Sequence, residues 1–272
     1  AKSKKIKIIN SCGFDSIPSD LGVHLLTQAV RTQSEKLDCL GILTKIRGGL
    51  SGGTFASIQN LVKTASDRKV ARILAHPMSL NPRPLPKTRE PKDQKEARYI
   101  KALDMWTAPF LMAGINTRIV RRSEALRGFE STDLNYHEAV RSRSRFKAML
   151  ASLGFILGLI SQVFAITRAV TAWFLPKPGE GPSKTERENG CFTFQLYGRA
   201  QGHETFTHRV TVHADSDPGY SATAKMLGQS ALCCLDEHDR PGGVTTPSVA
   251  LGDGLVDRLR AVGISFELEK LD

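Results

Sequence analysis

The sequence predicts an α/β fold with a mixed or antiparallel sheet and long helices. Residues 4–12 alternate between polar and apolar side chains and lead into a glycine, which is typical of a strand entering a tight turn. Residues 191–200 and 204–214 alternate in the same way around a Gln-Gly-His break, which predicts an antiparallel hairpin. A chain of 272 residues can bury the core of one large domain or two smaller ones.

The first half of the chain is predicted to mix strands and helices. After the first strand, Ser19 or Asp20 is expected to cap a helix that ends near Arg31. A second strand is expected at residues 39–47, and helical patterns cover residues 56–75, 105–124 and 136–150. Five prolines within residues 76–95 predict a loop or an extended connector there.

The C-terminal part continues after the hairpin with helical and strand patterns. Asp217 is expected to cap a helix that takes Pro218 in its first turn and reaches about residue 235. A Pro-Gly-Gly turn, a short helix near residues 255–262 and a strand at residues 264–269 complete the predicted elements.

Residues 148–167 are twenty residues without a charge, which is long enough for a transmembrane helix. Four basic residues precede them: Arg141, Arg143, Arg145 and Lys147. A membrane span would separate segments on its two sides that are expected to meet in one fold. Two interpretations remain, a helix that inserts into or docks on a lipid surface and the buried centre of a large domain.

Basic residues are concentrated in the first half of a chain with a net charge of +11. Residues 1–150 contain 27 Lys and Arg against 13 Asp and Glu, whereas residues 151–272 contain 11 against 14. A basic half suits an anionic membrane, a phosphorylated or carrier-bound substrate, or a solvated face. Nucleic acid is not predicted as a partner, because no nucleic-acid-binding motif accompanies the charge.

The cysteines and histidines predict neither disulfides nor a metal site. The five cysteines are scattered and include no C-x-x-C pair, so we expect a reducing, intracellular compartment. The seven histidines occur without a metal-binding motif, and no metal is predicted.

Residues 10–22, Asn-Ser-Cys-Gly-Phe-Asp-Ser-Ile-Pro-Ser-Asp-Leu-Gly, are the strongest candidate for a binding site. They follow the first strand, and α/β proteins place ligands at the carboxyl ends of strands. Gly13 would let a ligand approach the backbone, and Asp15 would accept a hydrogen bond. The alternative is a capped strand-to-helix turn, in which Asp15 holds backbone N–H groups.

Two further segments carry weaker signals. Residues 51–57 place glycines at the start of a helix with Thr54 and Ser57, which could bind an anion or only cap the helix. Residues 215–220 end in Tyr220, a candidate proton donor, with Lys225 five residues further on. That spacing puts the two on different helix faces, so a packing tyrosine after a capped helix start is the alternative.

Taken together, these segments resemble the saccharopine-dehydrogenase-like oxidoreductases, the family that includes the bacterial trans-acting enoyl reductases of glycolipid synthesis. The resemblance is carried, in the family's order, by residues 11–22, 52–54 with Ser57, 178–183, 217–227 and 242–248. The resemblance implies a Rossmann domain, an inserted substrate domain and a C-terminal segment that packs back. Residues 1–31 would end the dinucleotide-binding domain, residues 32–240 would form the α+β substrate domain, and residues 241–272 would form the returning segment.

The resemblance also implies a cofactor and residue roles. NADP, or NAD, would bind with its nicotinamide end near five residues: Ser11, Cys12, Gly13, Phe14 and Asp15. Substrate or an anion would contact Gly52, Gly53, Thr54 and Ser57. The family's N-terminal strand, glycine-rich turn and helix, which hold the pyrophosphate, have no counterpart in the sequence. We therefore expect that this chain alone does not bind NADP tightly.

The expected reaction is hydride transfer from NADPH to an α,β-unsaturated acyl group in lipid or glycolipid metabolism, with Tyr220 as proton donor. The alternative is a non-catalytic binding protein derived from the same fold. Either protein is expected inside the cell, at a membrane or lipid droplet or in the cytoplasm, with an acyl or lipid partner.

Overall fold

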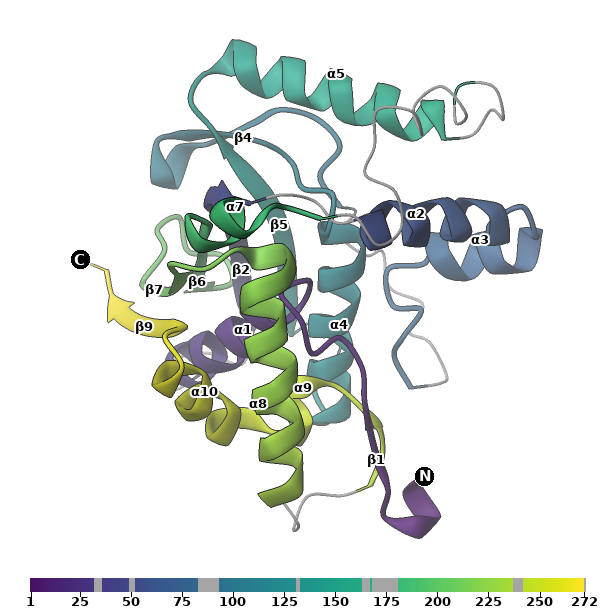
Figure 1. The fold of residues 1–272 in the computed structure, drawn as a ribbon. Coiled ribbons are helices and arrows are strands. Elements are labelled where there is room, and N and C mark those ends of the chain that lie inside the picture. Colours follow the sequence, from purple (N-terminus) through teal and green to yellow (C-terminus); the bar gives the residue numbers. More distant parts are fainter. Residues whose placement is uncertain are drawn as a thin grey trace.

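Seven strands form one mixed sheet in the order β3-β4-β5-β2-β6-β7-β9 (Figure 1). A computed structural model of the chain describes residues 1–31, 36–48, 52–82, 93–130, 133–162, 167, 181–236 and 242–271. The strands are β2 (Leu37–Arg47), β3 (Arg98–Ile100), β4 (Met105–Pro109), β5 (Leu134–Ser142), β6 (Cys191–Ala200), β7 (His208–Ala214) and β9 (Ser265–Lys270). Strands β2 and β5 are parallel and the other pairs are antiparallel, so the predicted α/β fold with a mixed sheet is confirmed.

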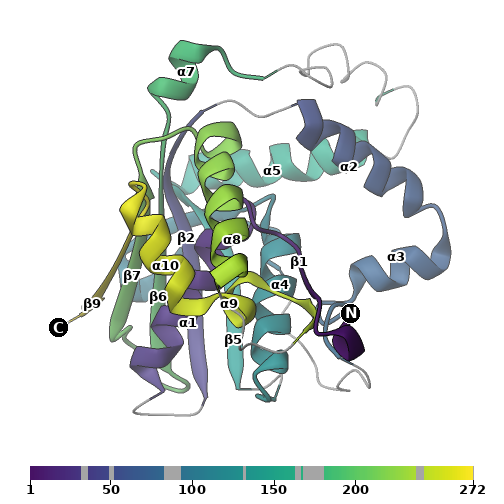
Figure 2. The same ribbon diagram turned by 60° about the horizontal axis from the view of Figure 1, so that its bottom comes forward.

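Helices cover one face of this sheet, as Figure 2 shows. Helix α1 (Ile17–Val30) lies on β6 and β7, α4 (Ala113–Leu126) lies on β5, and α9 (Pro247–Ala250) and α10 (Gly252–Ala261) pack on α1. Helix α8 (Thr223–Asp236) packs on α10 and follows a π-helical turn at Pro218–Ala222. The main core lies between α1 and the sheet and includes Leu21, Leu26, Phe192 and Leu196.

Two glycines let α1 lie close to β6. A Cβ atom at Gly22 would lie 2.5 Å from a methyl group of Leu196, and one at Gly198 would lie 2.8 Å from Leu26. Because side chains at both positions would clash, this contact needs glycine on each side. The helix that follows the candidate loop is thereby fixed on the sheet.

The remaining helices lie at the periphery. They are α2 (Gly52–Thr64), α3 (Arg68–Ala75), α5 (Arg145–Ser161) and α7 (Lys184–Glu188), with short 3₁₀ turns at Lys2–Lys4 and Lys101–Leu103. Helix α5 packs on β4 and β5 at the opposite end of the molecule from the N-terminus (Figure 1). No helix within the described ranges is long and apolar enough to cross a bilayer.

Strands β1 (Lys7–Ile9) and β8 (Gly243–Thr245) form a separate parallel pair, with Ile9 opposite Thr245. Parallel sheets are usually covered on both faces. Here Ile6, Ile8 and Val244 are exposed. The pair joins the N-terminal segment to the C-terminal segment, although they are more than two hundred residues apart.

Three predicted helices are wrong in part. Residues 105–124 form β4 and α4, because Pro109 ends a strand that pairs with β5. Residues 136–150 form most of β5 and the start of α5, and residues 56–75 are divided between α2 and α3. The α1 cap is Ser16, not Ser19 or Asp20, and Pro18 takes the second helical position. The predicted division of the chain into three domains or segments, with boundaries after residues 31 and 240, stays a prediction.

Candidate functional site

The loop of residues 10–16 joins the carboxyl end of β1 to the first turn of α1. Strand β8 runs parallel to β1 and ends beside it, so that Thr246 and α9 follow at the same edge. Ligands of α/β proteins bind at such strand ends. We therefore take this loop, called the β1–α1 loop below, as the candidate site.

Two side chains of the β1–α1 loop point into the protein. Cys12 is buried against Ser230 and Cys234 of α8, and burial raises the pKa of its thiol. Phe14 stacks edge-on against Phe192, with ring centroids 4.7 Å apart. Of the five residues expected near a cofactor, Cys12 can therefore offer only its backbone, whereas the Phe14 ring is only partly exposed.

The other three residues form the outer surface of the loop. Ser11 has a left-handed backbone conformation with φ of 63°, which is uncommon for a residue other than glycine. Gly13 is partly buried and lies against Thr223, whose methyl group would be 3.1 Å from a Cβ at this position. Asp15 is exposed, yet nearby protein atoms desolvate its carboxylate in part and raise its pKa. Ser11, Gly13 and Asp15 are thus the positions at which a ligand can touch the loop.

Asp20 ties the β1–α1 loop to two other segments. Its buried carboxylate accepts a 2.8 Å hydrogen bond from the Ser248 backbone N–H, at the start of α9. It also accepts a hydrogen bond from the Ser123 hydroxyl of α4, and that hydroxyl lies 2.7 Å from the Thr246 hydroxyl. Burial raises the pKa of Asp20, while these hydrogen bonds and Arg127 oppose the shift. One side chain therefore joins α1, α4 and α9.

A buried polar network lies beneath the loop. The Ser16 hydroxyl donates to the side-chain oxygen of Asn116 at 3.2 Å, and the Asn116 amide donates to Glu138 at 2.9 Å. The Tyr136 hydroxyl donates to the other Glu138 oxygen at 2.7 Å, and Ser19 also bonds to Glu138. Burial raises the pKa of Glu138 to about 7. The network thus places an acid that titrates near neutral pH two hydrogen bonds away from the loop.

The start of α8 forms one wall of the site. Asp217 caps it by accepting a 2.7 Å hydrogen bond from the Tyr220 N–H, as the sequence predicted. The ring and hydroxyl of Tyr220 lie against Gly181. A Cβ atom placed on Gly181 would lie 2.6 Å from the Tyr220 ring. Lys225 instead donates to the Val262 carbonyl at 3.1 Å. Tyr220 and Lys225 therefore have different neighbours and do not form a catalytic pair.

The structure brings together three of the five segments that carry the family resemblance and part of a fourth, whose residues 178–180 lie outside the described residues. Residues 11–22, 217–227 and 242–248 meet through Asp20, Phe14 and Thr223, and Gly181 joins them through Tyr220. The fifth segment lies at the start of α2. The exposure and contacts of Gly52, Gly53 and Thr54 lie outside what the structure describes. Ser57 is exposed. Their role at a substrate or anion stays a prediction.

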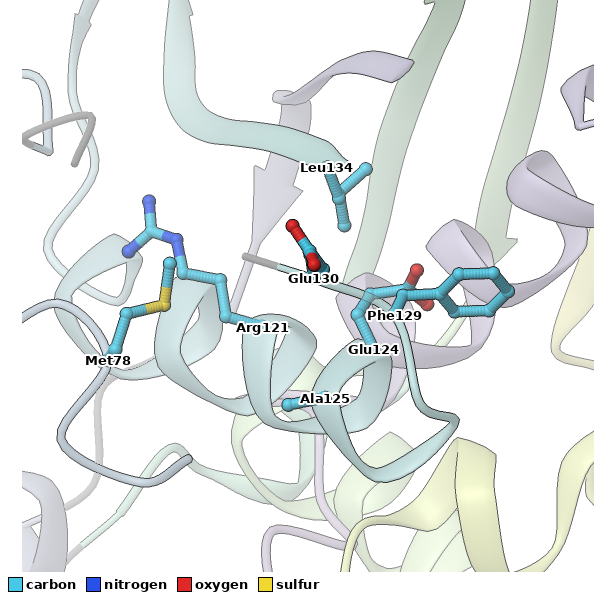
Figure 3. Close-up of a pocket in the computed structure, with 7 residues that line it drawn as sticks. All are labelled: Met78, Arg121, Glu124, Ala125, Phe129, Glu130 and Leu134. Atoms are coloured by element: carbon cyan, nitrogen blue, oxygen red, sulfur yellow. The ribbon is translucent and has the colours of Figure 1, made fainter. Parts of the chain in front are cut away.

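A small cavity at the C-terminal end of α4 is a separate feature (Figure 3). It measures about 10 Å³ and is lined by Met78, Arg121, Glu124, Ala125, Phe129, Glu130 and Leu134. That volume holds one water molecule at most. Arg31 covers the neighbouring surface by stacking 3.5 Å from the Phe129 ring while pairing with Glu124. We assign this cluster to the stability of the fold.

Neither Asn116 nor Glu138 belongs to a motif that could have identified it from the sequence. Both lie in segments that were predicted as helices, and they come together because α4 packs on β5. Among the described residues, no three His, Cys, Asp or Glu side chains gather closely enough to hold a metal ion. All five cysteines are free thiols.

Replacing Thr223 by valine tests how α8 holds the loop. The Thr223 hydroxyl accepts a 3.0 Å hydrogen bond from the Phe14 N–H, and valine keeps the shape without the acceptor. We expect the free energy of unfolding to fall by about 1–2 kcal/mol, because the Phe14 N–H loses its partner. Urea unfolding measures the change, and Thr64→Val on peripheral α2 is the matched control. Equal losses in the two variants would contradict the role of Thr223.

Comparison with known proteins identifies relatives over nearly the whole chain. A provisionally named trans-acting enoyl reductase of Mycobacterium tuberculosis is 35% identical over 285 residues, which cover 97% of this chain and 68% of the relative. Trans-acting enoyl reductases of Mycobacterium bovis and Mycobacterium ulcerans are 30% and 31% identical over 293 residues, with the same coverage. No protein-family model matches the chain. With this identity and coverage, the chain belongs to the family of trans-acting enoyl reductases.

Proposed function

We propose that this chain forms the substrate side of an NADP-dependent enoyl reductase of the saccharopine-dehydrogenase-like type. In the proposed reaction, the β-carbon of an α,β-unsaturated acyl group receives a hydride and the adjacent carbon receives a proton. The observation that carries the proposal is the β1–α1 loop, which presents Ser11, Gly13 and Asp15 at a parallel strand end. The membership of the family supports the reaction class.

The small parallel sheet supports a dinucleotide-binding domain as the neighbour of this loop. A two-stranded sheet is marginally stable alone, and the exposed Ile6, Ile8 and Val244 would be covered if further strands and helices joined it. The relatives are longer, since the matched region is 68% of their length. We propose that a dinucleotide-binding unit completes this sheet next to β1.

The residues at the loop fit the nicotinamide end of the cofactor and not its pyrophosphate. An amide of a nicotinamide ring could donate to Asp15 or accept from Ser11, and Gly13 leaves the backbone accessible. The β1–α1 loop contains one glycine, Gly13, and so lacks the glycine-rich turn that holds phosphates. The bound cofactor would supply the hydride, while this chain would position the acyl group.

Tyr220 is the proposed proton donor to the acyl group. It lies one turn before Thr223, which touches Gly13 and Phe14, so its element is fixed against the β1–α1 loop. In the proposed step the phenol O–H bond breaks and a C–H bond forms at the carbon next to the carbonyl. Solvent then restores the phenol proton.

The test uses the protein isolated from its natural source through an affinity tag at its C-terminus. We expect NADPH oxidation, followed by absorbance, that depends on an added long-chain enoyl thioester. Asp15→Asn is expected to lower kcat/KM on the order of tenfold, because a charge-assisted hydrogen bond becomes a neutral one. Asp257→Asn, on the exposed side of α10, is the matched control and is expected to leave kcat/KM unchanged.

Either of two results would overturn the proposal. One is the absence of thioester-dependent NADPH oxidation in a folded protein that binds NADPH. The other is a folded Asp15→Asn variant with unchanged kcat/KM, which would remove the loop from the site. The first result would favour a non-catalytic binding protein derived from the same fold.

A further inference from the structure

Helix α5 carries its apolar side chains on the side that faces away from the protein. Only Ala148 and Ser152 of this helix are buried, and they lie one turn apart on the side that rests on β4 and β5. Eight large apolar residues are exposed: Phe146, Met149, Leu150, Leu153, Ile156, Leu157, Leu159 and Ile160. A surface helix of a globular protein normally has the reverse arrangement, with its apolar stripe toward the core.

Seven of the exposed residues, all but Leu159, form one continuous stripe, which we call the outer face of α5. At the helical repeat of 100° per residue, they fall within an arc of about 120°, whose centre lies about 120° around the helix from Ala148 and Ser152. Phe146 is 75% exposed and Leu157 is 55% exposed, so these side chains project well beyond the backbone. The helix is roughly 25 Å long, at 1.5 Å per residue. Exposed apolar surface of this extent marks an interaction site.

Positive charge surrounds the N-terminal end of this stripe. Arg141, Arg143, Arg145 and Lys147 are exposed, and residues 141–162 contain no acidic side chain. None of these four residues forms an ion pair with another described residue. The Arg145 guanidinium lies 5.8 Å from the Trp106 ring. This combination of cations, an aromatic ring and an apolar stripe matches the chemistry of a lipid–water interface.

A groove beside the same helix end suits a phosphate headgroup. It has a volume of about 490 Å³ and is lined in part by Trp106, Arg141 and Arg143. Asp104 also lines it, but its carboxylate accepts a hydrogen bond from the Tyr99 hydroxyl. Arginine binds phosphate through paired donors, so the two guanidinium groups are well suited to an anionic headgroup.

We propose that the outer face of α5 docks on an anionic phospholipid surface, with the helix axis in the plane of the interface. The apolar stripe enters the acyl region, and the four basic residues contact the headgroups. A second copy of the chain is a poorer occupant, because each copy has a net charge of +11 and would repel the other. This docking does not depend on the proposed reductase activity.

The test is flotation of the purified chain with vesicles. We expect it to float with vesicles of 70% phosphatidylcholine and 30% phosphatidylglycerol, and to bind much less to phosphatidylcholine alone. The double variant Leu153→Gln/Leu157→Gln is expected to lower partitioning on the order of tenfold, because less apolar area enters the lipid. Arg141→Gln/Arg143→Gln is expected to lower it about fivefold per charge, and added salt should weaken wild-type binding.

Two matched controls separate α5 from general surface properties. Leu227 and Leu235 of α8 are 58% and 67% exposed, so Leu227→Gln/Leu235→Gln removes similar apolar surface elsewhere. Lys2→Gln/Lys4→Gln removes two exposed charges at the opposite end of the molecule. Both controls are expected to float like the wild type, and circular dichroism confirms that every variant is folded.

Several results would overturn the proposal. The wild type could stay folded and remain at the bottom of the gradient, or the α8 variant could lose as much binding as the α5 variant. Sedimentation velocity could instead show a dimer that Leu153→Gln/Leu157→Gln dissociates, which would assign the outer face to a second copy. No step of the assay involves NADPH or turnover. A failure of the docking proposal would therefore leave the proposed reaction unaffected, and a failure of the proposed reaction would leave the docking proposal unaffected.

Discussion

Replacing Asp20 by alanine is expected to lower the free energy of unfolding by about 3–5 kcal/mol, because a buried carboxylate that joins three helices is lost. The Ser248 N–H would be left buried without an acceptor, and the Ser123 hydroxyl would lose one of its partners. The cost of leaving buried donors unpaired exceeds the small gain from no longer burying the carboxylate. Urea denaturation followed by circular dichroism measures the change.

Asp20→Asn is the matched control for this prediction. Asparagine can accept from the Ser248 N–H and donate to the Ser123 hydroxyl, so that most of the contacts survive. We expect a loss of only about 1 kcal/mol. If alanine and asparagine destabilised the protein equally, the hydrogen bonds would not be the cause. If neither did, Asp20 would not join the helices as described.

Glu138→Gln is expected to stabilise the protein at alkaline pH and to have little effect in acid. Burial raises the pKa of Glu138 from its ordinary value of 4.5 to about 7. The native state therefore holds a proton that the unfolded state releases between these values. The stabilisation is fully present below about pH 4.5 and is lost as the pH rises through 7.

Glutamine imitates the protonated acid and cannot lose the proton. The difference in unfolding free energy between variant and wild type is therefore expected to grow by about 2–3 kcal/mol from pH 5 to pH 8. Urea unfolding at both pH values measures it, and the exposed Glu130→Gln serves as control. A difference that stayed constant with pH would show that Glu138 does not titrate in this range.

The regular elements of the fold could largely be predicted from local patterns. The hairpin of β6 and β7, the strand β2 and the capped start of α8 follow from alternation and from the capping residue Asp217. The three strands of the β3–β4–β5 edge could not. In β5, Tyr136 and Glu138 are two residues apart and both buried, but a charged residue at a buried position hides the alternation.

The candidate site could be predicted only in outline. The β1–α1 loop was found because its glycine and carboxylates follow a strand, a local signal. Which side chains face outward was not accessible, since Cys12 and Phe14 turn inward only because α8 and β6 lie behind them. Asn116 and Glu138 approach the loop through contacts across about one hundred residues of sequence, which no local pattern records.

The apolar segment of residues 148–167 also shows that a local sequence pattern does not decide how a segment packs. Its composition allowed either a buried helix or a helix at a lipid surface. The structure excludes burial for the part within α5, because eight of its large apolar side chains are exposed. Ala148 and Ser152, the two buried residues of α5, mark the side by which the helix rests on the sheet.

The pairing of β1 with β8 has a consequence for synthesis of the protein. The β1–α1 loop emerges from the ribosome more than two hundred residues before its partners Thr246 and Ser248. At about 5–20 residues per second, the delay is on the order of 10–50 s. During that time Asp20 and the edge of β1 have no native partners in the C-terminal segment, so the candidate site cannot reach its final structure before that segment is made.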